Sequence, residues 1–168
     1  MINVRPPQLQ DAVGIAVAHS RLWLANFGQY LSQEEQTPFN ESTLAGQWHD
    51  LLVEDTQGRR VVIAVEWGRV VGIAMTVPTV RNTGAVPPAR ARELTMHYLD
   101  KEFQGQGLGL RLLEYVCEPT EPMQLWVPQG YAGEARAYQI YRRAGFGTDG
   151  AVTGRDPSYG LPLMRMVR

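Results

Sequence analysis

Three closely spaced glycines, Gly105, Gly107 and Gly109, form the clearest candidate binding motif of the sequence. They lie in the segment 99–110, LDKEFQGQGLGL, between a predicted strand and a predicted helix. Glycine permits close backbone approach and positive φ, so consecutive N–H groups can point at one anion. The start of the following helix adds partial positive charge at the same place. This spacing predicts a phosphate or pyrophosphate site that is held by the backbone rather than by a lysine.

Two well-known phosphate-binding loops do not match the segment. A Walker A loop needs Gly-Lys-Ser/Thr, which the sequence lacks. The dinucleotide fingerprint G-x-G-x-x-G needs glycine at position 110, which is Leu110. Because short glycine motifs are weakly specific, a tight strand-to-helix turn without any ligand stays open as an alternative.

Hydrophobic periodicity predicts the elements that must position this turn. Helical spacing runs from Asp11 to about Gly28 and, less regularly, from Ser32 to Val53. A further helix follows the glycine turn, with Leu108, Leu112, Leu113 and Val116 on its buried side, and another covers 134–144. Strands are predicted at 1–5, 60–66, 69–77, 91–99, 123–127, 151–153 and 163–167, with a turn at Gln57–Gly58 and a loop that includes Asn82–Gly84. The order indicates a mixed α/β chain, and the lack of any linker indicates one domain over residues 1–168.

Composition excludes several classes of protein. The 168 residues contain 16 Lys+Arg and 17 Asp+Glu, and the net charge of −1 argues against a nucleic-acid binder. One cysteine excludes an internal disulfide and a cysteine-based zinc site. No run of residues approaches the roughly 20 apolar positions that span a bilayer. We therefore expect a soluble cytoplasmic protein that needs neither a membrane nor nucleic acid.

Two motifs in the same order resemble those of one family. Gln104-x-x-Gly107-x-Gly109, preceded by Leu99-Asp100 and followed by Leu112-Leu113, resembles the acyl-CoA-binding motif of the GNAT superfamily of N-acyltransferases. A second block, Leu125-Trp126-Val127 and then Ala137, Tyr141, Gly145 and Phe146, is similar to the family's fifth strand and following helix. The resemblance covers essentially the whole chain.

This resemblance implies a fold and a co-substrate. The implied GNAT fold is a twisted mixed β-sheet of about six to seven strands, flanked by helices and splayed between strands four and five. The implied co-substrate is acetyl-CoA, with no metal. The residues expected to bind it are His97 and Leu99, through their backbone, and the turn residues Gln104, Gly105, Gln106, Gly107, Leu108, Gly109 and Leu110. Glu134 departs from the pattern, because the family often has at this position an Asn that contacts the pantetheine arm.

The resemblance also implies an activity: acetyl transfer to a primary amine of a small molecule or peptide, by direct attack in a ternary complex. Tyr141 occupies the family's general-acid position, although its helical face is apolar and packing in the core is an alternative. A phenol with a pKa of about 10 can protonate a departing alkyl thiolate of similar basicity. Glu93 is the expected general base, with His97 and Glu66 as alternatives.

The sequence gives less information about the amine acceptor than about the co-substrate. The family's acceptor site is lined by its first helices and by the loop that joins its last strands, which nominates Trp23, Phe27, Tyr30 and Tyr159. Fold does not choose among amines, so the identity of the acceptor stays open. A homodimer is a reasonable default for the assembly. The alternative function is a CoA-binding regulatory or interaction module of the same fold without efficient catalysis.

Overall fold

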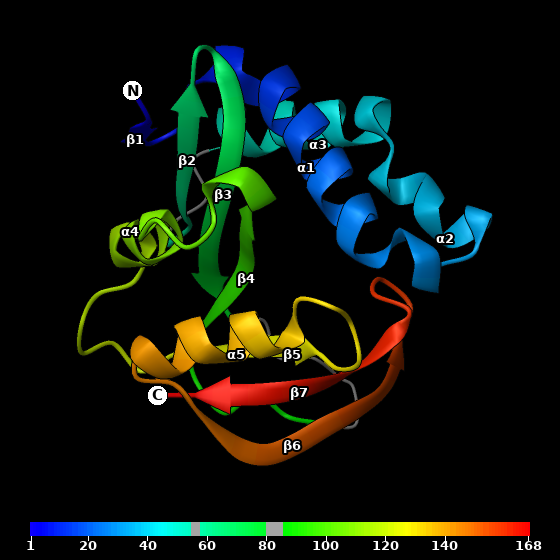
Figure 1. The fold of residues 1–168 in the computed structure, drawn as a ribbon, viewed down its shortest axis with the longest axis vertical. Coiled ribbons are helices and arrows are strands. Elements are labelled where there is room, and N and C mark those ends of the chain that lie inside the picture. Colours follow the sequence, from blue (N-terminus) through cyan, green and yellow to red (C-terminus); the bar gives the residue numbers. More distant parts are fainter. Residues whose placement is uncertain (55–57, 80–85) are drawn as a thin grey trace.

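The computed structural model describes residues 1–54, 58–79 and 86–168 (Figure 1). The helices are α1 (Ala12–Phe27), α2 (Gln33–Gln36), α3 (Glu41–Val53), α4 (Leu108–Val116) and α5 (Glu134–Arg143). Short 3-10 turns are η1 (Leu9–Asp11), η2 (Gly28–Tyr30), η3 (Thr37–Phe39) and η4 (Lys101–Phe103). The strands are β1 (Asn3–Arg5), β2 (Arg60–Glu66), β3 (Arg69–Pro78), β4 (Arg92–Leu99), β5 (Gln124–Pro128), β6 (Gly147–Asp156) and β7 (Leu161–Val167). The turn predicted at Gln57 and the loop predicted at Asn82–Gly84 lie outside the described ranges.

Within these ranges the strands form a seven-stranded sheet in the order β1-β2-β3-β4-β5-β7-β6. Strands β4 and β5 run parallel, and the other neighbouring pairs run antiparallel. Helices α1 and α3 lie beside the β2–β4 half of the sheet, and α5 lies over β5 and β7 (Figure 1). The arrangement confirms the predicted mixed sheet flanked by helices.

Two apolar cores lie on opposite faces of the sheet. Central strand β3 contributes to both, and its residues from Val70 to Thr76 are all buried, as expected for a strand covered on both faces. One core joins β2–β5 to α4, with α5 packed against it, and the other joins β2 and β3 to α1 and α3. Alternate residues of β4 therefore face different helices, which decides what each side chain can do.

The first strand of the predicted final pair is longer in the structure than the sequence indicated. The sequence predicted 151–153, whereas β6 spans Gly147–Asp156. Its residues are mostly exposed, three of them are glycines, and its pairing with β7 shifts register twice. Since β6 is an edge strand with few buried side chains, it lacks the alternation by which strands are recognised.

No helix within the described ranges is both long enough and apolar enough to cross a membrane.

The buried histidine His19 is expected to make the stability of the fold depend on pH. It lies on α1 with 5% of its surface exposed, and its Nδ1 accepts a hydrogen bond of 3.2 Å from Trp48 Nε1. Burial lowers the pKa of His19 from 6.5 to about 4. Between these values the unfolded chain takes up a proton that the folded chain does not. We therefore expect the free energy of unfolding to fall by about 3 kcal/mol through this group as the pH drops from 6.5 to 4.

Urea unfolding at several pH values tests this. The variant His19→Asn keeps an acceptor for Trp48 but does not titrate, so its stability should fall less steeply over the same pH range. The exposed His49→Asn serves as the matched control and should behave as the wild type does. Equal pH dependence in His19→Asn and wild type would contradict the expectation.

Candidate active site

The glycine turn presents an open row of backbone N–H groups at the start of α4. Gly105 and Gly107 have φ of +79° and +80°, and a Cβ at either position would meet nothing within 4 Å. From Gly105 to Leu110, no backbone N–H donates a hydrogen bond to an acceptor in the described part of the chain. The turn thus has the donor pattern that an anion needs at a helix start. Leu108 itself is buried in the core, so its contribution here is its backbone.

The side chain of Gln104 stabilises the conformation of the turn. Its Nε2 donates to the carbonyl of Leu99 at 3.0 Å, which closes the turn onto the end of β4. Its Oε1 accepts from Arg136 on α5. The neighbouring Gln106 is exposed, and its amide donates to the carbonyl of Glu102. Gln104 therefore connects the strand, the turn and α5.

Beside this turn the sheet opens between β4 and β5. The two strands pair at Glu93–Gln124 and Leu94–Leu125, near one end of each strand. A bulge at Thr95 shifts the pairing of β4 with β3. The N–H of Asp100 bonds to Val71 on β3, so the alternating backbone groups of His97 and Leu99 point the other way, toward β5. Beyond Leu94 this edge has no strand partner among the described residues, and the Leu99 carbonyl alone accepts from Gln104. The edge can pair with an extended chain that carries amides, and it confirms the predicted splay.

The hydroxyl of Tyr141 lies at this opening. It projects from α5 to within 3.3 Å of Nδ1 of His97 on β4. Burial raises the pKa of Tyr141 well above its usual value of 10, so the phenol keeps its proton at neutral pH. Both ring nitrogens of His97 are engaged, because Nε2 lies 2.9 Å from the carbonyl of Gly109. His97 is therefore not placed to act as a base toward an acceptor.

Glu93 stands at the other end of β4. Gln124 on β5 donates to its Oε2 at 2.6 Å, and the Gln124 oxygen accepts in turn from the N–H of Ala89 at 2.7 Å. Burial raises the pKa of Glu93, while the Gln124 hydrogen bond and the charge of Arg165 partly offset that effect. A raised pKa makes a carboxylate a better base. Glu66 lies at the hairpin end of β2, two strands away from β4.

Three of the four aromatic residues nominated for the acceptor, Trp23, Phe27 and Tyr159, meet in one cluster. The ring of Tyr159, between β6 and β7, lies 4.6 Å from that of Trp23 and 5.1 Å from that of Phe27. Trp23 and Phe27 are each only 4% exposed, so they form the buried base of the cluster. Tyr30 is half-buried in η2, and its carbonyl accepts from Arg155 of β6 at 3.2 Å. Helix α1 and the β6–β7 turn are thus held together here.

Sequence reasoning missed three aromatic members of this cluster, Phe39, Tyr98 and Tyr131. All three pack against the buried aromatics: the Phe39 ring lies 4.3 Å from that of Trp23, and the Tyr131 ring lies 5.0 Å from that of Phe27. Burial raises the pKa of Tyr131 and that of Tyr159 to about 12, so these phenols are neutral at pH 7. Tyr98 alternates with His97 and Leu99 along β4, and this alternation was the signal that could have placed it on the α1 side.

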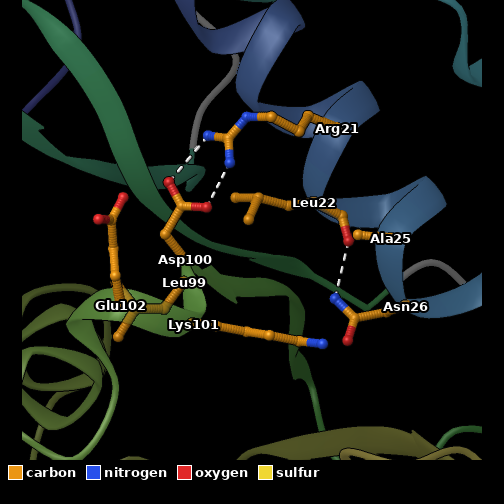
Figure 2. Close-up of a pocket in the computed structure, with 8 residues that line it drawn as sticks. All are labelled: Arg21, Leu22, Ala25, Asn26, Leu99, Asp100, Lys101 and Glu102. Carbon is orange, nitrogen blue, oxygen red and sulfur yellow. Dashed lines mark hydrogen bonds and ion pairs between the residues drawn. The ribbon is translucent and has the colours of Figure 1, made fainter.

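An ion network anchors the end of β4 next to the turn. Figure 2 shows the guanidinium of Arg21 reaching both carboxylate oxygens of the buried Asp100. Arg69 also contacts this carboxylate, at 2.7 Å. Burial alone would raise the pKa of Asp100, but the hydrogen bonds from Arg21 and Arg69 outweigh it and the pKa is lowered. A cavity of about 300 Å³ opens beside this network, between α1 and residues 99–102. Neither Tyr141 nor the aromatic cluster lines it.

Glu134 has a local partner at the position where the sequence departs from the resembled motif. Its Oε2 accepts a hydrogen bond of 2.6 Å from the N–H of Gly130, which closes the loop before α5. The described residues contain no group of three or more His, Cys, Asp or Glu side chains that could hold a metal ion.

One family model and several solved structures match this chain. A family model described as "Acetyltransferase (GNAT) domain" matches residues 57–148, which is more than half of the chain. A search of curated proteins finds no match.

Among solved structures, the chain is similar to PaiA N-acetyltransferase from Thermoplasma acidophilum in complex with coenzyme A. The TM-score is 0.63 at 14% identity, over 98% of both chains. It is also similar to yncA from Salmonella typhimurium, solved with its cofactor acetyl-CoA, with a TM-score of 0.68 at 17% identity over 100% of this chain and 93% of that one. A GNAT-family acetyltransferase from Streptococcus pneumoniae has a TM-score of 0.68 at 16% identity, over 100% and 98%. At identities of 14% to 17%, the similarity to these structures shows a shared fold and nothing beyond it.

Proposed function

The chain belongs to the GNAT acetyltransferase family, and from this premise we propose that it transfers the acetyl group of acetyl-CoA to a primary amine of a small molecule or peptide. The observation that carries the proposal is the open row of N–H groups from Gly105 to Leu110 beside the free edge of β4. Both features fit coenzyme A, whose pyrophosphate is an anion and whose pantetheine arm contains amides.

The residues that would hold acetyl-CoA follow from this fit. The turn residues from Gly105 to Leu110 would bind the pyrophosphate through their N–H groups, and Gln104 would keep the turn closed. His97 and Leu99 would pair with the pantetheine amides through their backbone. When bound, acetyl-CoA supplies an acetyl group activated as a thioester.

Two side chains would carry the proton transfers of a direct attack in a ternary complex. Glu93, whose pKa is raised by burial, would accept the proton that the attacking amine loses. Tyr141, held as a neutral phenol, would give its proton to the leaving sulfur. Tyr159, packed on the buried Trp23 and Phe27, and Tyr30 of η2 would contact the acceptor.

A second candidate function is a CoA-binding regulatory module of the same fold. It is favoured by Glu134, which bonds to its own loop at the position where the family often has the Asn that contacts pantetheine. Such a module would bind CoA and transfer nothing.

Thiol release separates the two functions. Purified chain is mixed with acetyl-CoA and a panel of primary amines, peptides and amine-containing antibiotics, and free CoA thiol is followed with a chromogenic reagent. The single cysteine, Cys117, is 8% exposed, so the protein adds little background. We expect release that depends on the acceptor, with the acetylated amine identified by mass spectrometry. Tight CoA binding by calorimetry without transfer to any acceptor would favour the regulatory module.

The proposal extends to a cytoplasmic location, where such an enzyme would meet acetyl-CoA, and to a homodimer, which light scattering of the purified chain would detect.

A further inference from the structure

The side chain of His97 lies between the glycine turn and Tyr141. Its Nε2 is 2.9 Å from the carbonyl oxygen of Gly109, in the first turn of α4, and its Nδ1 is 3.3 Å from the hydroxyl of Tyr141 on α5. Three elements that come from separate parts of the sequence are thus joined through one imidazole.

The direction of both hydrogen bonds follows from the chemistry of the partners. A carbonyl oxygen can only accept, so the proton of the ring must sit on Nε2 and be donated to Gly109. Burial lowers the pKa of His97 to about 4, so the ring is neutral at pH 7 and Nδ1 carries a lone pair. The hydroxyl of Tyr141 is therefore the donor to Nδ1.

Gly109 is closely packed between α5 and the imidazole of His97. A Cβ at position 109 would lie 3.0 Å from Cδ1 of Ile140 on α5 and 3.6 Å from Nε2 of His97. The end of the Ile140 side chain would have to shift by a few tenths of an ångström, whereas the imidazole would be in ordinary van der Waals contact. The last glycine of the motif thus lets α5 pack closely on α4 beside His97, apart from any contact with a phosphate.

We propose that His97 is a positioning residue for acetyl transfer, whose imidazole holds the Tyr141 hydroxyl in place and ties it to the carbonyl of Gly109 beside the CoA-binding turn. This inference rests on the proposed function, since it assigns His97 a role in that reaction. It gives the His97 side chain a role separate from that of its backbone. The phenol has a single proton, which it donates to Nδ1 in this structure, so the O–H would turn from Nδ1 to the leaving sulfur in the reaction. The uncharged imidazole fixes the place of the phenol oxygen without taking that proton.

Two substitutions separate the two hydrogen bonds of His97. The amide of His97→Asn reaches the place of Nδ1, so it retains an acceptor for Tyr141 and loses the bond to Gly109. The amide of His97→Gln reaches the place of Nε2, so it retains the donor to Gly109 and loses the bond to Tyr141. The exposed His49→Gln is the matched control.

We expect His97→Gln to lower kcat by about ten-fold, the effect of one lost hydrogen bond, with the KM for acetyl-CoA unchanged. His97→Asn should lower kcat less than His97→Gln does, and His49→Gln should change nothing. In a Tyr141→Phe background, His97→Gln should have no further effect on kcat. Equal losses in His97→Asn and His97→Gln, or an additive loss in the Tyr141→Phe background, would indicate a merely structural residue and overturn the proposal.

Nitrogen NMR of the histidine side chains tests the same inference without turnover. The full chain is labelled and saturated with coenzyme A, and the His97 signals are assigned by their loss in His97→Asn, since the chain has three histidines. We expect a neutral ring protonated on Nε2, with an Nδ1 signal that moves in Tyr141→Phe. A ring protonated on Nδ1, or an Nδ1 signal indifferent to Tyr141→Phe, would refute the proposal. If the wild type acetylates no amine, the thiol-release assay rejects the proposed function, whereas this measurement still decides how His97 holds Tyr141.

Discussion

Replacing Tyr141 with phenylalanine is expected to lower kcat by about 100-fold, because a positioned general acid contributes at least this factor. The phenol is held as a neutral donor by burial and lies at the opening between β4 and β5. Phenylalanine keeps the ring and removes the proton that would reach the leaving sulfur. The affinity for CoA, measured by calorimetry, should stay within about two-fold, since the turn that binds phosphate is untouched.

Tyr138→Phe is the matched control on the same helix. Tyr138 packs against the same core one turn before Tyr141, and Arg142 lies over its ring. Its substitution should leave kcat unchanged. Unchanged turnover of Tyr141→Phe with the true acceptor would show that Tyr141 is a packing residue, and equal losses in both variants would trace the effect to α5 rather than to the phenol.

Replacing Gly107 with valine is expected to weaken CoA binding by about 100-fold, which corresponds to about 2.7 kcal/mol. Gly107 caps the N-terminus of α4 with φ of +80°, a conformation that a β-branched residue adopts only with strain. Relaxation of that strain would turn the N–H groups of the following residues away from a common anion. Titration of CoA into the variant, followed by calorimetry, measures the loss.

Gly68→Val separates this effect from general strain. Gly68 has φ of +78° in the β2–β3 hairpin, and a Cβ there would also meet nothing within 4 Å. Its substitution should lower stability in the same way and leave the CoA affinity unchanged. Unchanged affinity in Gly107→Val, or equal weakening in Gly68→Val, would rule out the phosphate-binding turn.

The two substitutions with the largest expected effects thus change different measured quantities, kcat for Tyr141→Phe and CoA affinity for Gly107→Val. Loss of the Tyr141 hydroxyl should change the chemical step, whereas distortion at Gly107 should change binding. Because one side chain and one backbone turn are tested separately, a regulatory module that only binds CoA would respond to the second substitution and not to the first.

Elements with strong periodicity were predictable within one or two residues. The helix predicted from Asp11 to Gly28 is α1 (Ala12–Phe27), and the strand pair at 60–66 and 69–77 is the β2–β3 hairpin. Burial on one or two faces leaves a regular apolar pattern in such elements. Edge strand β6 has little buried surface, so its length was underestimated.

For the candidate site, local spacing was sufficient to predict the glycine turn, since its left-handed positions and the helix start lie within a few consecutive residues. The contacts between Tyr141, His97 and Gly109 could not be read from spacing. They join β4, α4 and α5, and they depend on a bulge in β4 and on the distance at which α5 packs. Long-range packing also placed Trp23 and Phe27 at the buried base of the aromatic cluster and brought Tyr98 and Tyr131 to it. Backbone conformation is a local property that residue types control directly, whereas the partner of a side chain depends on which elements the folded sheet brings together.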